Sequence, residues 1–281
     1  MSFSETVLLG ALAGFTIFLG LPVGRLQKLG SRTRVALAMF SVGVLVFLLV
    51  DVLAHGFEIA EGAVEAFKDG DGSFLHAAWL TLLLLGGFAL GSAGLGIAER
   101  RMRSRNAPPI AGGATDTLAA GEPRSVVDAA RAQALRTGLM IAAAIGLHNF
   151  AEGLAIGVSA QSGEIGLATV LIIGFALHNA TEGFGIVGPL GDVTPSWRWL
   201  ALAGVIGGGP TFLGSMIGYS VTSEPLELAF YALAGGAILY VIGEIWHGMG
   251  RFGHREVGLI LLACGFSAGI ITDLVVAYGG G

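Results

Sequence analysis

The chain has 281 residues and a formal net charge of −5; hydrophobic residues make up 54% of it and charged residues only 12%. A typical soluble domain has about 25% charged residues, so this chain could not cover a surface with solvated side chains. The composition therefore excludes an ordinary soluble domain and indicates a protein that crosses a membrane several times. The one cysteine, Cys264, excludes a disulfide framework and any cysteine-based zinc module.

Eight long apolar runs predict eight membrane-spanning helices. Each run has the length of about 20 residues that a helix needs to cross a bilayer. Runs such as TLLLLGGFALG are continuously apolar, which excludes the alternating strands of an outer-membrane barrel. We therefore expect an all-α polytopic membrane protein with one transmembrane domain over residues 1–281. Its predicted spans cover residues 6–24, 35–55, 77–98, 136–160, 165–188, 199–220, 226–247 and 257–277.

The basic residues predict the orientation of these spans. Of the 15 lysines and arginines, only Lys68 lies in a loop on one side of the predicted membrane, and the rest lie in the alternate loops or at their edges. Basic residues mark the cytoplasmic side, so both termini are expected in the periplasm or outside the cell. The outer loop 57–74 carries five acidic residues. They indicate either a solvated extension of the second span or an acidic mouth that concentrates cations.

The longest loop, residues 99–135, contains the run NAPPIAGGATDTLAAGEP. This composition cannot build a core and predicts a flexible cytoplasmic linker. We expect no domain boundary there, because a membrane bundle can pack across such a linker.

A polar motif occurs twice in the apolar runs, as GLHNFAEGLAIG in the fourth span and ALHNATEGFGI in the fifth. Both copies read L-H-N-x-x-E-G and lie 30 residues apart. Histidine and glutamate at positions i and i+4 share one face of a helix. Consecutive spans are antiparallel, so two copies can be related by an axis in the membrane plane and converge on one site.

The residue types in the two copies predict a site for a divalent metal ion. Buried carboxylates are costly unless they are paired or bound to metal, and neither span holds a lysine or arginine near them. Imidazole with carboxylate suits Zn²⁺, and also Cd²⁺, Fe²⁺, Mn²⁺ or Co²⁺, and contains too much nitrogen for a dedicated Mg²⁺ or Ca²⁺ site. The alternative is a set of polar packing groups that satisfy one another. The predicted metal ligands are His148, Asn149, Glu152, His178, Asn179 and Glu182.

Further polar residues in the spans are candidates for an ion pathway. Asp51 and His55 lie at i and i+4 in the second span, and Glu58 follows towards the outside. Glu244 and His247 share a face of the seventh span near its cytoplasmic end. Interfacial capping is the alternative for the first pair, and a simple place at the interface is the alternative for His247.

Together these features resemble the ZIP (Zrt/Irt-like) family of divalent metal transporters. The resemblance rests on the paired HNxxEG motif, the eight spans and the long loop after the third span; GGFALG and GGGPTFLG are similar to segments of bacterial members. It implies an inverted repeat of three, two and three spans, with metal uptake across the inner membrane into the cytoplasm. It also implies that the six motif residues bind the ion and that Glu244 is an accessory ligand. The expected partners are the metal ion and the lipid bilayer, with a homodimer as the candidate oligomer and no nucleic acid.

Two departures from the family pattern concern metal binding. Many members carry a glutamate just before the proline of the sixth span, where it helps to bind a second ion, but this chain has Gly209. We therefore expect one principal ion, or one principal ion with a second that binds more weakly. The loop 99–135 contains no histidine, so metal sensing by that loop is not expected. Pro210 itself predicts a break in the sixth span.

Three functions are compatible with the residues, and the buried carboxylates argue against one of them, a purely structural or receptor-like membrane subunit. Of the other two, the first is metal transport, in which the ion is a substrate and no catalytic cofactor is needed. The second is an intramembrane zinc metallohydrolase, in which a glutamate acts as general base. The absence of an H-E-x-x-H motif and the symmetry of the two copies favour the transporter, because a catalytic site needs differentiated roles.

Overall fold

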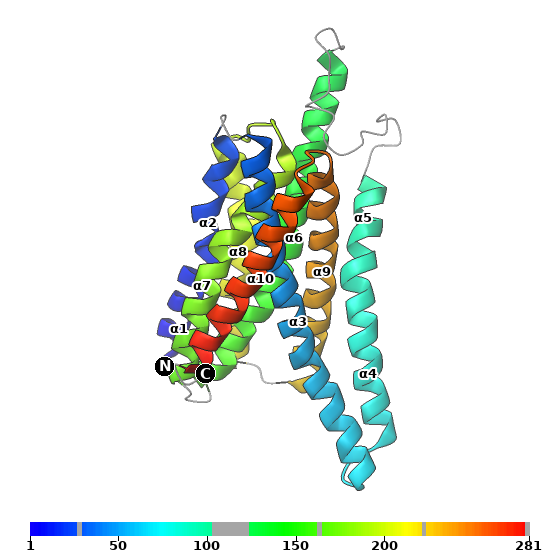
Figure 1. The fold of residues 1–281 in the computed structure, drawn as a ribbon. Helices are drawn as coiled ribbons and strands as arrows, with labels where there is room; N and C mark the ends of the chain where they lie inside the picture. Colours follow the sequence, from blue (N-terminus) through cyan, green and yellow to red (C-terminus); the bar gives the residue numbers. More distant parts are fainter. Residues whose placement is uncertain (27–29, 103–123, 162–164, 221–222, 279–281) are drawn as a thin grey trace.

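The computed structural model describes residues 1–26, 30–102, 124–161, 165–220 and 223–278, and within these ranges the chain is almost entirely helical and has no strand (Figure 1). The α-helices are α1 Phe3–Phe15, α2 Ile17–Gly20, α3 Ser31–Asp69, α4 Phe74–Ala89, α5 Leu95–Met102, α6 Arg124–Gln161, α7 Ile165–Val187, α8 Trp197–Ser220, α9 Glu224–Gly250 and α10 Arg255–Tyr278. Three shorter helices join some of them: the 3-10 helices η1 Leu21–Arg25 and η3 Gly188–Leu190, and the π-helix η2 Leu90–Gly94.

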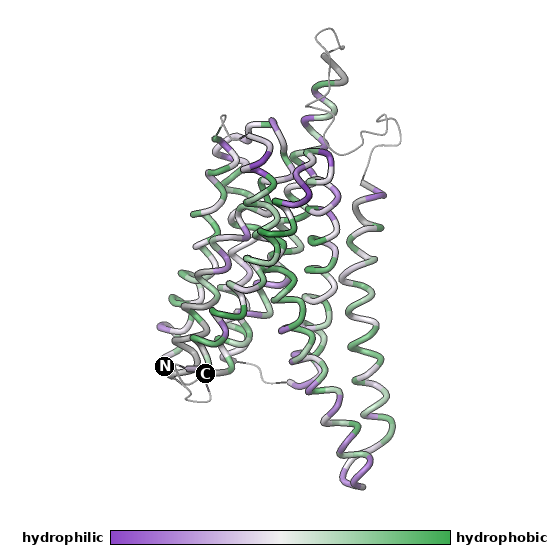
Figure 2. Tube along the Cα trace, in the orientation of Figure 1, coloured by the Kyte–Doolittle hydropathy of each residue, from purple (hydrophilic) through white to green (hydrophobic). Residues whose placement is uncertain are grey.

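Eight helical segments cover the eight predicted spans, and the described residues contain no strand, which confirms the all-α polytopic fold. The first segment is α1–α2–η1, the third is α4–η2–α5, and the others are single helices. Seven segments are long and apolar enough to cross a membrane within the residues searched, and the eighth, α7, has 23 residues. The start of α1 and the end of α10 lie at the same end of the bundle (Figure 1). Figure 2 shows mainly apolar residues along the helices.

The second span is much longer than a bilayer requires. The 39 residues of α3 would extend about 58 Å, against about 30 Å for the hydrocarbon core. The last turns of α3 and the first turns of α4 form a hairpin that projects beyond the other helices (Figure 1). Gly70 ends α3 in the left-handed conformation, with φ of 86°, and Ser73 caps α4. The acidic residues predicted in an outer loop are therefore mostly on an extension of the second span.

The helices pack as two groups. One group contains α1, α2, α6, α7 and α8, and the other contains α3, α4, α9 and α10. The groups meet where α6 packs on α9 and where α7 packs on α3 and α10. The repeated motif lies on α6 and α7, the two helices of the first group that pack on the second group.

Glycines at the helix crossings follow the predicted inverted repeat. A Cβ atom at Gly91 of η2 would collide with the carbonyl oxygen of Leu233 on α9. In the same way, a Cβ atom at Gly43 of α3 would collide with the carbonyl oxygen of Leu262 on α10. The third and seventh spans thus cross as closely as the eighth and second do. Small residues permit such close approach of helix backbones.

Two details of the sequence prediction were wrong. The linker expected over 99–135 is shorter, because α5 runs to Met102 and α6 begins at Arg124; its central part lies outside the described residues. The stretch 124–136 contains four alanines and three arginines, which are strong helix formers. The predicted break at Pro210 is absent, since α8 continues through it. Proline removes one hydrogen bond, and the neighbouring helices hold α8 on both sides of it.

Arginines from three elements gather at the end of the bundle opposite the termini. They hold the loop between η3 and α8: Arg25 donates to the Pro195 carbonyl, Arg34 lies 3.0 Å from Asp192, and Arg131 donates to the Thr194 carbonyl over 3.3 Å. Basic residues of separate predicted loops therefore lie at one end of the molecule.

Candidate metal site

The first copy of the motif lies on α6 and is buried. His148 is 1% exposed and Glu152 is 5% exposed. Their spacing places them on one face, one turn apart, and the Nε2 atom of His148 lies 2.8 Å from the Oε1 atom of Glu152. The fourth span thus brings one nitrogen and one oxygen atom, both of types that bind metal ions, to the same place.

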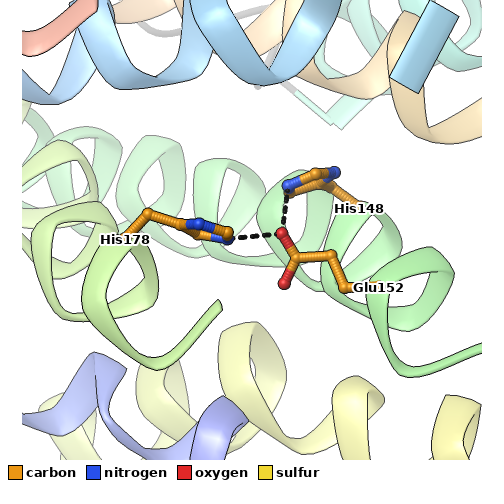
Figure 3. Close-up of side chains that lie close together, drawn as sticks. All are labelled: His148, Glu152 and His178. Carbon is orange, nitrogen blue, oxygen red and sulfur yellow. Dashed lines mark hydrogen bonds and ion pairs between the residues drawn. The ribbon is translucent and has the colours of Figure 1, made fainter. Parts of the chain in front are cut away.

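The second copy, on α7, faces the first. The Nε2 atom of His178 lies 2.5 Å from the same Oε1 atom of Glu152, so the two imidazoles flank one carboxylate (Figure 3). The potential ligand atoms of His148, Glu152 and His178 all lie within 4.8 Å of one another. Two nitrogens and one oxygen so close together could bind a single metal ion.

Glu182 joins this cluster through Asn149. The amide nitrogen of Asn149 donates to Glu182 Oε2 over 3.2 Å and to the carbonyl oxygen of Gly207 on α8 over 3.0 Å. The Oε1 atom of Glu182 lies 4.0 Å from Nε2 of His148. Both motif glutamates are therefore near the same imidazole.

Asn179, the asparagine of the second motif copy, is held in a similar way by the first span. Its amide nitrogen donates to the carbonyl oxygen of Ala13 over 3.2 Å. That carbonyl lies at the junction of α1 and α2, where it also accepts a hydrogen bond from Thr16. Each motif asparagine is thus fixed through its nitrogen by a backbone carbonyl of a neighbouring span, which leaves its oxygen as the remaining acceptor. No pattern in the sequence points to these carbonyls, because every residue has one.

The site contains more buried polar atoms than its own side chains satisfy. Among the described residues, the only ion pairs made by Glu152 and Glu182 are with the imidazoles. Polar atoms that are buried there without a hydrogen-bond partner are Nδ1 of His148, Oδ1 of Asn149 and Asn179, Oε2 of Glu152 and Oε1 of Glu182. A buried carboxylate needs a counter-charge, and a divalent cation supplies one.

The predicted pathway residues lie outside the three-residue cluster. Asp51 on α3 is half-buried, with Oδ1 3.9 Å from Nδ1 of His55, and His55 and Glu58 are exposed. On α9, Glu244 is half-buried and makes an interaction of its own, whereas His247 is exposed. The structure therefore places these five residues on α3 and α9, the helices that pack on α7 and α6.

Gly209 lies on α8, and the space beside it is open. A Cβ atom there would have only Cγ1 of Val205 within 4 Å, at 3.9 Å. The glycine is therefore not required by packing, and the position could hold a larger side chain.

The comparisons with known proteins bear on this site directly. A search of curated protein sequences finds no match. A sequence model of the ZIP zinc transporter family matches residues 99–242, which is more than half of the chain. The match includes both motif copies and α8, and it ends two residues before Glu244. The protein is a multi-pass membrane protein that belongs to the ZIP zinc transporter family, a family of metal ion transporters.

Proposed function

We propose that this protein carries divalent transition-metal ions, with zinc as its main substrate, across the inner membrane into the cytoplasm. The observation that carries the proposal is the buried cluster of His148, Glu152 and His178, which two neighbouring helices, α6 and α7, bring together. A transition-metal ion prefers such mixed nitrogen and oxygen ligands. The remaining unpaired oxygens of Glu182 and the two asparagines would complete its coordination.

The proposed direction follows from charge. The arginine-rich end is cytoplasmic by the positive-inside rule, so the hairpin of α3 and α4 lies outside. Its five acidic residues attract cations to the entrance. Ions would then pass Glu58, His55 and Asp51, bind at the cluster, and leave past Glu244 and His247.

Uptake of zinc into proteoliposomes tests the proposal. The double variant His178→Ala with Glu182→Ala removes one nitrogen and one oxygen ligand, and we expect uptake to fall to the level of empty liposomes. The control is His76→Ala with Glu224→Ala. It removes an exposed histidine–glutamate pair, 3.4 Å apart, that joins α4 and α9 outside the site.

The two double variants remove the same residue types, so the comparison separates the site from general effects of lost charge. We expect the control to keep wild-type uptake. Wild-type uptake by the His178–Glu182 variant, in protein that elutes as the wild type does, would refute the proposed site.

A further inference from the structure

Most hydroxyl groups in the membrane-spanning helices bond to their own helix. A serine or threonine inside a helix can donate to a carbonyl in the preceding turn, which satisfies the hydroxyl without a partner elsewhere. This occurs for Thr16, Thr81, Ser92, Thr181, Ser215, Ser220, Ser267 and Thr272. In the described part of the chain, two buried hydroxyls depart from this rule and have no hydrogen-bond partner: Ser41 and Thr211.

Ser41 lies where three helices meet, and the space around its hydroxyl depends on a glycine. The residue is on α3 and is 1% exposed. A Cβ atom added to Gly185 of α7 would lie 2.9 Å from the Ser41 hydroxyl oxygen and 3.1 Å from Cδ1 of Ile245 on α9. Any larger residue at 185 would therefore press on the hydroxyl.

This junction lies on the face of α7 that carries the candidate metal site, further along the helix. Gly185 follows Glu182 by three residues and His178 by seven, so the three positions share one face of α7. Because α7 runs towards the arginine-rich end, Gly185 lies about 5 Å nearer to that end than Glu182 does. Ile245 directly follows Glu244, so the Ser41 hydroxyl and Glu244 lie at similar depths.

Thr211, the second hydroxyl without a partner, lies on α8 and does not adjoin this face of α7. Its hydroxyl oxygen is 2.8 Å from the position of a Cβ atom on Gly14, at the crossing of α1 and α8. The Thr211 hydroxyl therefore lies where its own helix, α8, crosses α1.

We propose that the Ser41 hydroxyl is a transient ligand that the metal ion meets after it leaves Glu182 on its way to the cytoplasm. This inference rests on the proposed transport function. An unpaired hydroxyl in an apolar junction lowers stability, so a role in transport would account for its presence. A neutral hydroxyl also binds a metal ion more weakly than a carboxylate does. A conducting pathway needs such sites, because an ion must be able to leave each one.

Two substitutions at position 41 test the inference. Ser41→Ala removes the oxygen, and we expect the maximum rate of zinc uptake to fall by about threefold to tenfold with little change in the zinc affinity of the purified protein. The thermal unfolding midpoint should stay the same or rise, since the variant also removes an unpaired polar group. Loss of rate without loss of stability distinguishes a pathway ligand from a structural serine.

Ser41→Cys, made together with Cys264→Ala, replaces oxygen with sulfur. Soft thiolate ligands favour Cd²⁺ over Mn²⁺, so the ratio of cadmium to manganese uptake should change by about tenfold relative to the Cys264→Ala protein. A serine with only a packing role would leave this ratio unchanged.

The matched control is Ser215→Ala. Ser215 is fully buried, and its hydroxyl donates to the Phe212 carbonyl over 2.9 Å, so its removal should leave uptake as in the wild type. If the wild type and this control transport no metal, the proposed function fails. If both transport metal and both Ser41 variants match them in rate and ion preference, the role of Ser41 alone is refuted.

Discussion

At the scale of single residues, the site depends on one shared oxygen. The Oε1 atom of Glu152 lies within 2.8 Å of His148 Nε2 and 2.5 Å of His178 Nε2, so this one side chain joins the two motif copies. The second carboxylate, Glu182, is reached through Asn149. The two glutamates therefore have different surroundings, although they occupy equivalent positions in the repeat.

Glu152 should accordingly decide whether zinc stabilises the protein. An ion that binds only the folded protein stabilises it by about 2.7 kcal/mol when the free ion is about 100-fold above its Kd. We expect zinc to raise the thermal unfolding midpoint of the wild type and to have little effect on Glu152→Gln, because a neutral amide replaces the shared carboxylate. Glu58→Gln removes an exposed carboxylate of α3 and should keep the full effect of zinc. An equal rise in Glu152→Gln would mean that the ion binds elsewhere.

The sequence could predict which side chains meet at the site, but not what orients them. His148 and Glu152 meet because residues at i and i+4 share a helix face, and the second copy obeys the same rule. The carbonyls of Ala13 and Gly207 that fix the two asparagines could not be predicted, since they depend on how α1 and α8 cross the central helices. Ser41 was missed for the same reason, because only the packed structure shows that its hydroxyl has no partner.

At the scale of helices, composition predicted the spans well and their irregularities less well. Apolar length located all eight segments, but it could not show that α3 continues to Asp69 as one helix. Proline in the sixth span suggested a break, yet α8 is continuous. The glycines beside it have different surroundings: Gly208 lies against the Gly14 carbonyl of α1, whereas Gly209 faces open space. Such a difference between neighbouring positions depends on tertiary packing.

Alanine substitutions at Gly208 and Gly209 should therefore have different effects on the free energy of unfolding. In Gly208→Ala the new methyl group would collide with the Gly14 backbone, and we expect a loss of about 1–3 kcal/mol in the free energy of unfolding, typical of overpacking. Gly209→Ala meets no such contact, and alanine is the better helix former by up to about 1 kcal/mol, so stability should be unchanged or higher. Thermal unfolding of the purified variants in one detergent measures both. Equal losses of stability in the two variants would show that α8 does not pack closely on the Gly14 backbone of α1 at this crossing.

At the scale of the whole molecule, charge and symmetry act together. The crossing of η2 with α9 matches that of α10 with α3, as an inverted repeat requires, and the motif copies lie on the central pair α6 and α7. An inverted repeat by itself gives no direction to transport, because its two halves are related by a turn about an axis in the membrane plane. Direction must come from features outside the repeat, and here the acidic hairpin at one end and the arginines at the other are such features.

The two ends of α3 provide a direct test of this orientation. Thr33 is exposed near the start of α3, at the arginine-rich end, and Asp71 is exposed in the turn after its other end. In a Cys264→Ala background, Thr33→Cys and Asp71→Cys each give the protein one accessible thiol. Because basic residues stay on the cytoplasmic side, we expect a membrane-impermeant maleimide to label Asp71→Cys in spheroplasts and Thr33→Cys only in inverted membrane vesicles. Both variants should be labelled in detergent, and the Cys264→Ala protein should give no signal under any condition. The reverse pattern would place the acidic hairpin in the cytoplasm, and the proposed entry through Glu58, His55 and Asp51 would then become an exit.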